Sequence, residues 1–518
     1  MSIWKNCYRL IWTTKLRTLL ILVTILWILN FQFFSSLFNS NGTPFEVLYE
    51  IVVYYVIILF LTTLFSFSKI LNILVYNFLF IISIVGVYFI NTMGIVVDGT
   101  MLNNVLSTDS AEAIELLNST FYIYLLLSLI GLYFINKYFL FKQERMNLKD
   151  YGVTIVIVLL IAFGLFKTDR DSLDKFMATD TPSVAPLFLI PSIGEYVNSR
   201  DRLVEINKKN ISSEYELVND TNDTIVVFIL GESARGDKFG LNGYTKNTTP
   251  NLAKNGNVIS FKDATSCHTS TLNSVPCLMT RVEQKNYDIT IDETSFVEIY
   301  KDLGFKTYWY SRHSNQKRVN TFCEEAEVCE YLKDTKYDMA LVEKLETLEN
   351  LEQNTLVVLH TLGSHFDYNE RVPEAYKLFK PLCYGNVSGC DKESLNNSYD
   401  NTIHYTDVVI AALIEKLKDK NACIVFTSDH GESLGEDSLG LVERYGHSTP
   451  YAIAPKEQKD VPFILWFSDR YLQKHPSVNV SSIRAKKGVN HDNVFSTVLS
   501  CGGITPKYEE EKLNLLNR

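Results

Sequence analysis

The apolar positions in the first third of the chain form long runs that are separated by short polar segments. A helix needs about 20 mostly apolar residues to cross a bilayer, because the hydrocarbon core is about 30 Å thick. The first run is not a signal peptide, since four more runs follow it and it has no small-residue cleavage site. We therefore expect a five-helix transmembrane domain at 1–168. The predicted spans are 16–38, 45–67, 70–91, 121–141 and 151–166.

Positive charges are distributed unevenly among the segments that join these spans. Lys and Arg occur before the first span, between the second and third, and between the fourth and fifth, whereas 39–44 and 92–120 contain neither. Loops rich in Lys and Arg stay in the cytoplasm. The N-terminus is therefore expected in the cytoplasm, and five crossings would place everything after about residue 167 on the outer side.

Beyond an expected linker at 169–220, the pattern changes to short apolar runs that alternate with helical periodicity. The runs are continuous and rich in β-branched residues, as in strands that are buried on both faces. The alternation predicts a second domain at 221–518, with an α/β architecture and a mostly parallel central sheet. The predicted strands are 224–230, 306–310, 354–360, 422–428 and 461–467, and 402–418 is a predicted helix.

The charge balance agrees with this division. Residues 1–199 contain 12 Lys and Arg and 13 Asp and Glu, and the remaining 319 residues contain 37 and 46. The first part is therefore lipid-like, and the second resembles an ordinary acidic globular domain. A formal net charge of −10 argues against a general nucleic-acid-binding protein, which would present a basic face.

Six of the nine cysteines fall in the second domain as close pairs. Closely spaced cysteines in an oxidising compartment predict local disulfides, which agrees with an outer location of this domain. A metal site is the alternative, but no pair has the C-x-x-C spacing of a zinc ribbon. Cys423 lies in a predicted strand and is expected to be a small buried residue. The pairs are Cys267/Cys277, Cys323/Cys329 and Cys383/Cys390.

Residues that can bind a metal follow three of the predicted strands. Glu232 follows the first, the segment 360–365 contributes two histidines after the third, and Asp429 and His430 follow the fourth. Ligand sites in such sheets lie at the carboxyl ends of the strands, so these side chains are expected to meet there. Carboxylates and imidazoles suit zinc or a similar divalent ion. His447 lies a little downstream.

Each of these residues also has a structural explanation. Glu232 could cap a helix, and His360 at a strand end is more often structural than ligating. Asp429 and His430 are harder to explain in that way, because two adjacent buried ionisable groups are costly unless they are paired or metal-bound. The pattern as a whole favours a metal site.

A hydroxyl-rich loop, "SCHTSTLNSVPC" at 266–277, offers a nucleophile. A hydroxyl bound to zinc has a lowered pKa and becomes usable for attack. A formylglycine nucleophile would instead need C-x-P-x-R, and the segment 277–281 lacks the proline. The residues alone do not choose among the four hydroxyls of the loop, which are Thr269, Ser270, Thr271 and Ser274.

Six longer motifs are specific when they are taken together. They are "GESARGDKFGLNGYTKNTTPNL" (231–252), "SCHTSTLNSVPC", "GSHFDY" (363–368), "SDHGESLGE" (428–436), "GHSTPYAIAP" (446–455) and "HDNVFSTVL" (491–499). With the five spans, they resemble the bacterial phosphoethanolamine transferases of the lipid A and colistin-resistance type. That family belongs to the alkaline phosphatase and sulfatase superfamily, so the resemblance implies an α/β domain of that type after the transmembrane domain.

The resemblance also implies roles for individual residues. Zinc would be held by Glu232, Asp429 and His430, with Thr271 as both ligand and nucleophile. One zinc ion is expected to bind firmly. His365 and His447 would line the phosphate pocket, assist the reaction and be able to hold a second ion.

The resemblance also assigns a function to the loop 92–120. From the residues alone, 110–117 is an amphipathic helix on the membrane surface. The family instead uses this loop to bind the ethanolamine headgroup, which implies Asn104, Thr108 and Glu112 here. Two further pocket residues are matched only loosely, by Asn315 and Lys317.

The implied reaction is transfer of phosphoethanolamine from phosphatidylethanolamine, through a phosphothreonine intermediate, to an acceptor at the outer surface of the bacterial inner membrane. Lipid A is the commonest acceptor in the family. Lipid A that carries the cationic phosphoethanolamine group is expected to bind cationic peptides such as polymyxin more weakly. A core sugar of lipopolysaccharide, a periplasmic glucan, or a periplasmic protein or glycan are alternatives. A phosphoglycerol transferase of the lipoteichoic-acid-synthase type and a non-catalytic binding protein are the competing hypotheses.

Three residues depart from the family pattern. His268 stands where relatives usually have Gly, and Phe366 and Asp367 replace a common Gly-Pro. These departures lie beside the nucleophile loop and the pocket His365, so they are expected to alter the rim of the pocket and to bear on acceptor choice.

Overall fold

The computed structural model describes most of the chain and divides it into two compact units. The first unit is helical and the second contains the sheet. The described residues are 14–39, 43–107, 117, 119–142, 148–201, 208–218, 221–287, 292–313, 317–348, 353–385, 387–436, 443–508 and 512–516.

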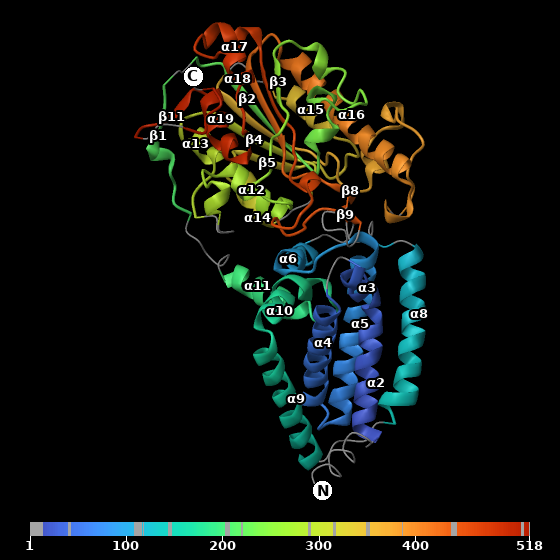
Figure 1. Ribbon diagram of the computed structural model, residues 1–518. Helices are drawn as coiled ribbons and strands as arrows, with labels where there is room; N and C mark the ends of the chain where they lie inside the picture. Colours follow the sequence, from blue (N-terminus) through green and yellow to red (C-terminus); the bar gives the residue numbers. More distant parts are fainter. Residues whose placement is uncertain are drawn as a thin grey trace. The chain divides into compact units, whose positions relative to one another are not determined.

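The helical unit has long apolar helices where the sequence predicts spans. Among the described residues, four helices are long and apolar enough to cross a membrane, or five if a bent pair counts as one span. In Figure 1, α4 packs between α2 and α9, and α5 packs on α2 and α8. The helices are α2 (Thr14–Leu29), α3 (Phe31–Asn39), α4 (Pro44–Leu64), α5 (Lys69–Met93), α8 (Ser119–Ile135) and α9 (Leu148–Thr168), and α6 (Gly99–Ser107) begins in this unit but clusters with the second unit from Asn104 on.

The bent pair is the first predicted span, which is broken at Asn30. The segments on either side of Asn30 meet at 64°. The buried Asn30 carboxamide donates to the carbonyl of Ala185 at 2.7 Å and accepts from the amide of Ala185 at 2.8 Å. Asn side chains compete with the helix ladder for backbone partners. The carboxamide therefore ties the break to a distant backbone segment.

Part of the predicted linker is helical. Residues 170–201 include α10 (Arg170–Lys175) and α11 (Leu189–Asp201), and the chain up to Val197 clusters with the helical unit. Asp169 caps α10 through the backbone of Ser172 at 3.0 Å. Only the remainder of the predicted linker, from residue 198, falls in the second unit.

The second unit is built on a seven-stranded sheet of order β3-β10-β7-β2-β6-β4-β5. The five strands from β7 to β5 are parallel, and β10 is antiparallel to both of its neighbours. All five predicted strands are present, and the sheet is mostly parallel as predicted. Its strands are β2 (Thr224–Gly231), β3 (Val258–Phe261), β4 (Lys306–Ser311), β5 (Val328–Tyr331), β6 (Thr355–His360), β7 (Asn421–Ser428) and β10 (Phe463–Phe467).

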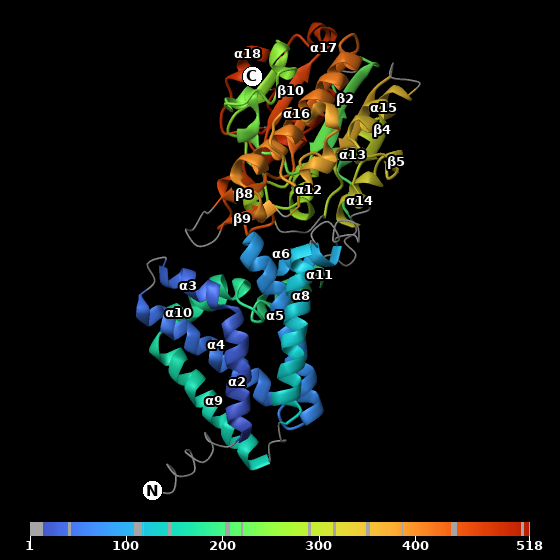
Figure 2. The same ribbon diagram turned by 90° about the vertical axis from the view of Figure 1, so that its right-hand side faces the viewer.

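Helices cover both faces of this sheet (Figures 1 and 2). The predicted helix 402–418 is the second part of the longer α16. Four short strands pair outside the sheet: β1 (Tyr215–Leu217) with β11 (Ile504–Pro506), and β8 (Ser433–Glu436) with β9 (Arg444–Gly446). The helices are α12 (Thr271–Met279), α13 (Phe296–Asp302), α14 (Lys317–Cys323), α15 (Met339–Glu346), α16 (Lys392–Leu417), α17 (Asp469–Lys474), α18 (Val480–Arg484) and α19 (Val494–Cys501).

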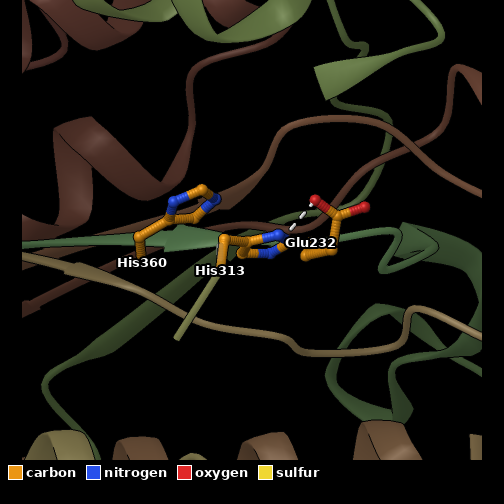
Figure 3. A group of neighbouring side chains, drawn as sticks. All are labelled: Glu232, His313 and His360. Carbon is orange, nitrogen blue, oxygen red and sulfur yellow. Dashed lines mark ion pairs between the residues drawn. The ribbon is translucent and has the colours of Figure 1, made fainter. Parts of the chain in front are cut away.

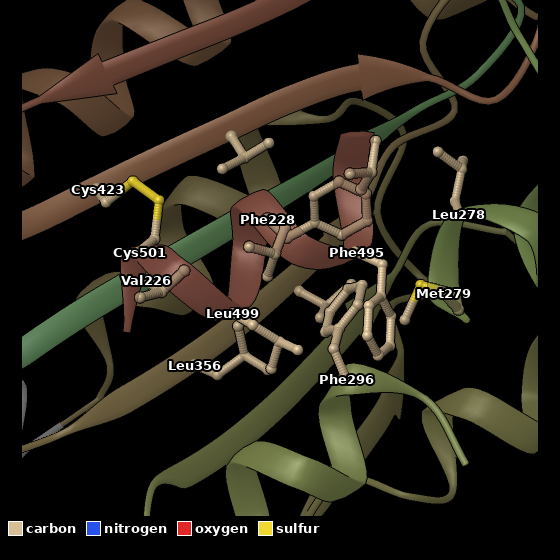
Figure 4. Packing of buried hydrophobic residues seen from close by; sticks show 14 of the residues in the cluster. Val226, Phe228, Leu278, Met279, Phe296, Leu356, Cys423, Phe495, Leu499 and Cys501 are labelled. Atoms are coloured by element: carbon tan, nitrogen blue, oxygen red, sulfur yellow. A yellow bond between two sulfur atoms is a disulfide. The ribbon is translucent and has the colours of Figure 1, made fainter. Parts of the chain in front are cut away.

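A hydrophobic core fills one face of the sheet (Figure 4). Alternate residues of β2, such as Val226 and Phe228, pack against Phe296 of α13 and Phe495 of α19. Alternation is required because successive side chains of a strand point to opposite faces. Helices α12 and α14 complete this layer, so α12 is packed against the sheet.

The three predicted disulfides are present, linking Cys267 to Cys277, Cys323 to Cys329 and Cys383 to Cys390. The prediction that Cys423 is buried is confirmed, but it was wrong to leave this residue without a disulfide partner. Cys423 in β7 is buried, but it is bonded to Cys501 at the end of α19 in a fourth disulfide, visible in Figure 4. These two cysteines are 78 residues apart, so a search for close pairs misses them.

Candidate metal centre and nucleophile

The register of the parallel strands brings the predicted ligands together. In the sheet, Gly231 of β2 pairs with Ser428 of β7, so the next residues, Glu232 and Asp429, leave the sheet side by side. His360 ends β6 opposite Leu230, on the other side of β2. Residues of three strands therefore converge at one edge, as the sequence predicts.

The Thr271 hydroxyl lies within this group. It is the first residue of α12, and its Oγ1 donates to Oε2 of Glu232 at 3.1 Å and lies 3.3 Å from Nε2 of His430. The same Nε2 is 3.5 Å from Oε1 of Glu232 and 3.3 Å from Oδ2 of Asp429. Thr271 is thus the hydroxyl of the loop that contacts two of the three predicted ligands, Glu232 and His430.

The electrostatics of the group fit a divalent cation. Glu232, Asp429 and His430 are fully buried. Burial, and then the charge of Asp429, raise the pKa of Glu232 well above its usual range, and burial followed by His447 lowers that of His430. Asp429 Oδ2 takes no hydrogen bond from any described residue. A bound cation would neutralise the two carboxylates and use the free oxygen, so the donor set fits zinc.

His447 and His365 border the same group. The ring centroid of His447 lies 4.2 Å from that of His430 and 5.7 Å from that of His365. Glu432 is buried and accepts from Nδ1 of His447 at 2.9 Å and from the hydroxyl of Tyr368 at 3.1 Å. Burial alone would raise the pKa of Glu432, but His447 lowers it overall. Glu432 therefore fixes the orientation of His447.

His313 belongs to the site and was not predicted. It follows β4, stacks on His360 with centroids 4.2 Å apart, and lies 3.4 Å from Oε2 of Glu232 (Figure 3). Potential ligand atoms of these three residues lie within 4.8 Å of one another. Their rings are almost parallel, at 16°, and Nε2 of His313 is 2.8 Å from the carbonyl of Thr361. A carbonyl oxygen can only accept, so Nε2 of His313 carries a hydrogen and its 3.4 Å contact with Oε2 of Glu232 supports that carboxylate.

The imidazole of His360 makes a structural contact through one of its nitrogens. Its Nδ1 lies 3.3 Å from the hydroxyl of Ser311, whereas its buried Nε2 has no hydrogen-bond partner in the described part of the chain. Burial lowers the pKa of His360 to about 4, so the ring is neutral at neutral pH. His313 could have been found by the signal that points to His360, which is an imidazole at the carboxyl end of a buried strand or within two residues of it.

Several predicted residues lie outside what the structure describes. Thr108, Glu112 and Asn315 are not among the described residues, and neither is most of the predicted helix 110–117. Asn104 lies in α6 and Lys317 begins α14, but their side chains are not described. The roles expected for these five residues remain predictions.

Of the departures from the family pattern, His268 packs its ring against Tyr451, with centroids 6.2 Å apart. The carbonyl of Phe366 accepts from the Arg371 guanidinium at 2.6 Å, and Asp367 caps the short turn Tyr368–Arg371 through the amide of Asn369 at 3.1 Å. Phe366 and Asp367 therefore hold the segment that follows His365.

A glycine is required where the turn after β6 crosses Glu232. Gly363 has a φ of +50°, and a Cβ there would lie 2.6 Å from the carbonyl oxygen of Glu232. We expect Gly363→Ala to lower both thermal stability and activity, because the turn or Glu232 must move. The matched control is Gly304→Ala, where φ is +88° and the added Cβ meets open space. It should cost only the conformational strain of about 1–2 kcal/mol. Equal effects of the two variants on activity would contradict this account.

A buried carboxyl near the site predicts a pH-dependent stability. Burial, then the charge of Asp237, raise the pKa of Asp460 from its usual value to about 7. The folded chain therefore holds a proton that the unfolded chain releases, so this group makes stability fall as pH rises from about 4 to about 7. We expect Asp460→Asn to raise the melting temperature at pH 8 and to have little effect at pH 4, the lower end of this range. Asp469→Asn, which removes an exposed carboxyl, controls for the lost charge. A gain that is the same at both pH values would refute the argument.

Comparison with known proteins places these features in a family. The family described as Sulfatase matches residues 224–504, and the one described as Phosphoethanolamine transferase EptA/EptB matches residues 53–200. Phosphoethanolamine transferase EptA of Escherichia coli K12 is 30% identical over 524 residues, covering 94% of each chain. Kdo(2)-lipid A phosphoethanolamine 7''-transferase of Salmonella typhimurium is 30% identical and covers 81% of this chain and 80% of its own.

A solved structure agrees with the sequence relatives. The integral membrane protein lipooligosaccharide phosphoethanolamine transferase A of Neisseria meningitidis superposes with a TM-score of 0.85 at 26% identity, covering 96% of this chain and 98% of the other. The similarity thus extends over the apolar helices as well as the unit that carries Thr271 and Glu232. The chain therefore belongs to the phosphoethanolamine transferase family, with a sulfatase-like catalytic unit.

Proposed function

We propose that this protein transfers phosphoethanolamine from phosphatidylethanolamine to lipid A, with Thr271 as the nucleophile. The observation that carries the proposal is the Thr271 hydroxyl, which lies within 3.3 Å of both Glu232 and His430. Thr271 is nine-tenths buried and begins a helix, so its oxygen is shielded from bulk water, and the first turn of α12 favours an anionic phosphate.

The reaction has two displacements at one phosphorus atom. In the first, the Thr271 oxygen loses its proton and attacks the phosphate of phosphatidylethanolamine. The bond from phosphorus to the glycerol oxygen breaks, and diacylglycerol leaves after its oxygen takes up a proton. In the second, a phosphate oxygen of lipid A attacks the same phosphorus atom, the bond from phosphorus to the Thr271 oxygen breaks, and that oxygen takes up a proton to restore the hydroxyl.

The metal would be held by Glu232, Asp429, His430 and Thr271. A zinc ion there would lower the pKa of the Thr271 hydroxyl and offset negative charge on the transferring phosphoryl oxygens. A second ion would fit between His365 and His447.

His447 and His365 act on the glycerol oxygen that leaves in the first displacement and on the acceptor oxygen that attacks in the second. Glu432 anchors Nδ1 of His447 and so orients the ring, and the imidazole would exchange a proton with each of these oxygens. His365 lies across from His447 and binds the phosphate. Asn104, Thr108 and Glu112 would hold the ethanolamine ammonium, and Asn315 and Lys317 would line the pocket.

The apolar helices suit a lipid donor and a lipid acceptor. We propose that they span the bacterial inner membrane, with the N-terminus in the cytoplasm and the catalytic unit in the periplasm. The four disulfides of the catalytic unit support an oxidising compartment. The Salmonella typhimurium relative, whose name gives Kdo(2)-lipid A as acceptor, supports an acceptor that contains lipid A, and the 7'' position in that name keeps a core sugar as the alternative.

The test is mass spectrometry of lipid A from cells with and without the protein, combined with assay of the purified protein on phosphatidylethanolamine. We expect lipid A to gain the mass of one phosphoethanolamine and diacylglycerol to be released. Release of diacylglycerol with unchanged lipid A would refute this acceptor and direct the search to a core sugar, glucan or protein. Consumption of phosphatidylglycerol instead would establish a phosphoglycerol transferase. No turnover of either lipid by metal-loaded protein would favour a binding protein.

A further inference from the structure

His491 is a buried histidine between the nucleophile loop and the strand that carries the metal ligands. It opens the motif "HDNVFSTVL", which contributes to the family resemblance but has no role in the proposed reaction. Its side chain is almost fully buried, and the residue starts the short turn His491–Asn493 ahead of α19. Its imidazole contacts two backbone groups that are far apart in the sequence.

Both ring nitrogens of His491 make a hydrogen bond. The backbone amide of Cys267 donates to Nδ1 at 3.0 Å, and Nε2 lies 2.9 Å from the carbonyl oxygen of Ser428. An amide can only donate and a carbonyl can only accept, so Nδ1 is unprotonated and Nε2 carries the hydrogen. Burial lowers the pKa of His491 to about 4, which keeps this single neutral form at neutral pH.

The two backbone groups belong to the two halves of the site. Ser428 ends β7 and directly precedes Asp429 and His430. Cys267 begins the loop that the disulfide to Cys277 closes and that contains Thr271. One rigid five-membered ring therefore sets the separation between the backbone that supports the nucleophile and the backbone that supports the ligands.

We infer that His491 is a positioning residue for the transfer reaction, which holds the Thr271 loop in register with the Asp429–His430 pair. This inference rests on the proposed function, because it assigns Thr271 as the nucleophile. A displacement of the nucleophile by about 1 Å can lower the rate about 10²-fold. Such a displacement acts on the chemical step and leaves the binding of the lipid headgroup unchanged.

The loop has other contacts that keep it folded when His491 is changed. Gln284 donates from its side chain to the carbonyl of Cys267 at 2.9 Å, and its amide donates to Asp492 at 2.8 Å. The hydroxyl of Thr269 donates to the carbonyl of Thr449 at 2.6 Å. Variants of His491 are therefore expected to fold with the disulfide formed.

The experiment compares three variants of the full chain in detergent with phosphatidylethanolamine as donor. His491→Phe fills the same space without either hydrogen bond, His491→Asn can accept from Cys267 only, and His491→Gln can donate to Ser428 only. We expect kcat to fall about 10²-fold in His491→Phe, with KM within about twofold of the wild type and bound zinc at the wild-type ratio. His491→Asn and His491→Gln should each fail to restore kcat, because the two backbone groups are held at a fixed separation only when both hydrogen bonds form.

His475→Phe is the matched control. His475 is also buried, but it stacks on Tyr471 after α17, and α17 begins beside the start of β7, whereas the ligands follow the end of that strand. It should retain wild-type kcat. Wild-type kcat in His491→Phe would overturn the inference. Loss of zinc together with activity would also overturn it, because it would show a general structural role. Full rescue by either Asn or Gln would show that one contact suffices and would refute the bridge.

A second measurement separates this inference from the proposed function. Amide hydrogen exchange of the same full-length variants is followed in peptides that contain 266–271 and 428–430. Faster exchange of both peptides in His491→Phe, and not in His475→Phe, is the expected result whether or not the lipid is turned over. Unchanged exchange would overturn the bridge even if transfer is confirmed. Faster exchange without any transfer by the wild type would instead refute the proposed function.

Discussion

Replacing Thr271 with Ala is expected to abolish phosphoethanolamine transfer. The substitution removes the only oxygen of the nucleophile loop that contacts both Glu232 and His430 among the described residues. Loss of a nucleophile that acts with its neighbours as a unit lowers kcat by at least about 10⁴-fold. The measurement is diacylglycerol release from phosphatidylethanolamine, together with the intact mass of the protein, which should show a covalent phosphoethanolamine in the wild type only.

Ser274→Ala is the matched control for this loop. Ser274 lies one helical turn after Thr271 in α12, is equally well shielded, and has no side-chain hydrogen bond to the described residues. It should retain most of the activity. Thr271→Ser keeps the oxygen and should keep part of the activity. A covalent adduct that still forms in Thr271→Ala would show that another hydroxyl is the nucleophile.

The second large effect is expected from Asp429→Asn, which should lose the bound metal and lower kcat at least about 10²-fold. Asn can still accept from the amides of His430 and Ser233 through Oδ1, as Asp429 does at 2.7 and 3.1 Å. The shape of the site is therefore kept, while one negative charge and the ligand oxygen Oδ2 are lost. Metal content is measured by elemental mass spectrometry of the purified chain.

Asp407→Asn provides the comparison for loss of a buried carboxylate. Asp407 is fully buried and accepts from the amides of Asn251 and Leu252 at 3.0 and 2.8 Å. Its replacement should lower the melting temperature and leave the metal in place. The metal assignment fails if Asp429→Asn binds zinc at the wild-type ratio, or if both variants lose it alike.

The positions of the strands could be predicted because a strand buried on both faces needs a continuous apolar run. The direction of a strand could not, and β10 shows why. Its run resembles those of β2 and β7, yet it is antiparallel to β7. The edge strands β3 and β5 were missed because each is only four residues long. Such short segments have too few positions to establish a pattern.

The site was predictable as far as it depends on strand ends. Glu232 and Asp429 meet because their strands are neighbours, and a parallel sheet places both carboxyl ends at one edge. His313 required the same reasoning to be applied to β4. The partners of His491 could not be predicted, because its two contacts are backbone groups, whose positions depend on the folded chain and not on residue type.

The break at Asn30 shows a similar limit in the helical unit. Hydropathy treats 16–38 as one apolar run, since a single Asn changes the average little. The carboxamide has its effect through two hydrogen bonds with Ala185, which is 155 residues away. The effect of one polar residue in an apolar helix therefore depends on a partner that the local sequence does not contain.

The Cys423–Cys501 disulfide has a consequence for how the catalytic unit withstands cleavage. The stretch between these cysteines carries Asp429, His430, His447 and His491. A single cut anywhere between them, for example by a periplasmic protease, would leave the two fragments covalently joined. The two fragments of a nicked chain would separate on electrophoresis only after reduction. Asp429 and the three histidines would stay within one covalently linked protein.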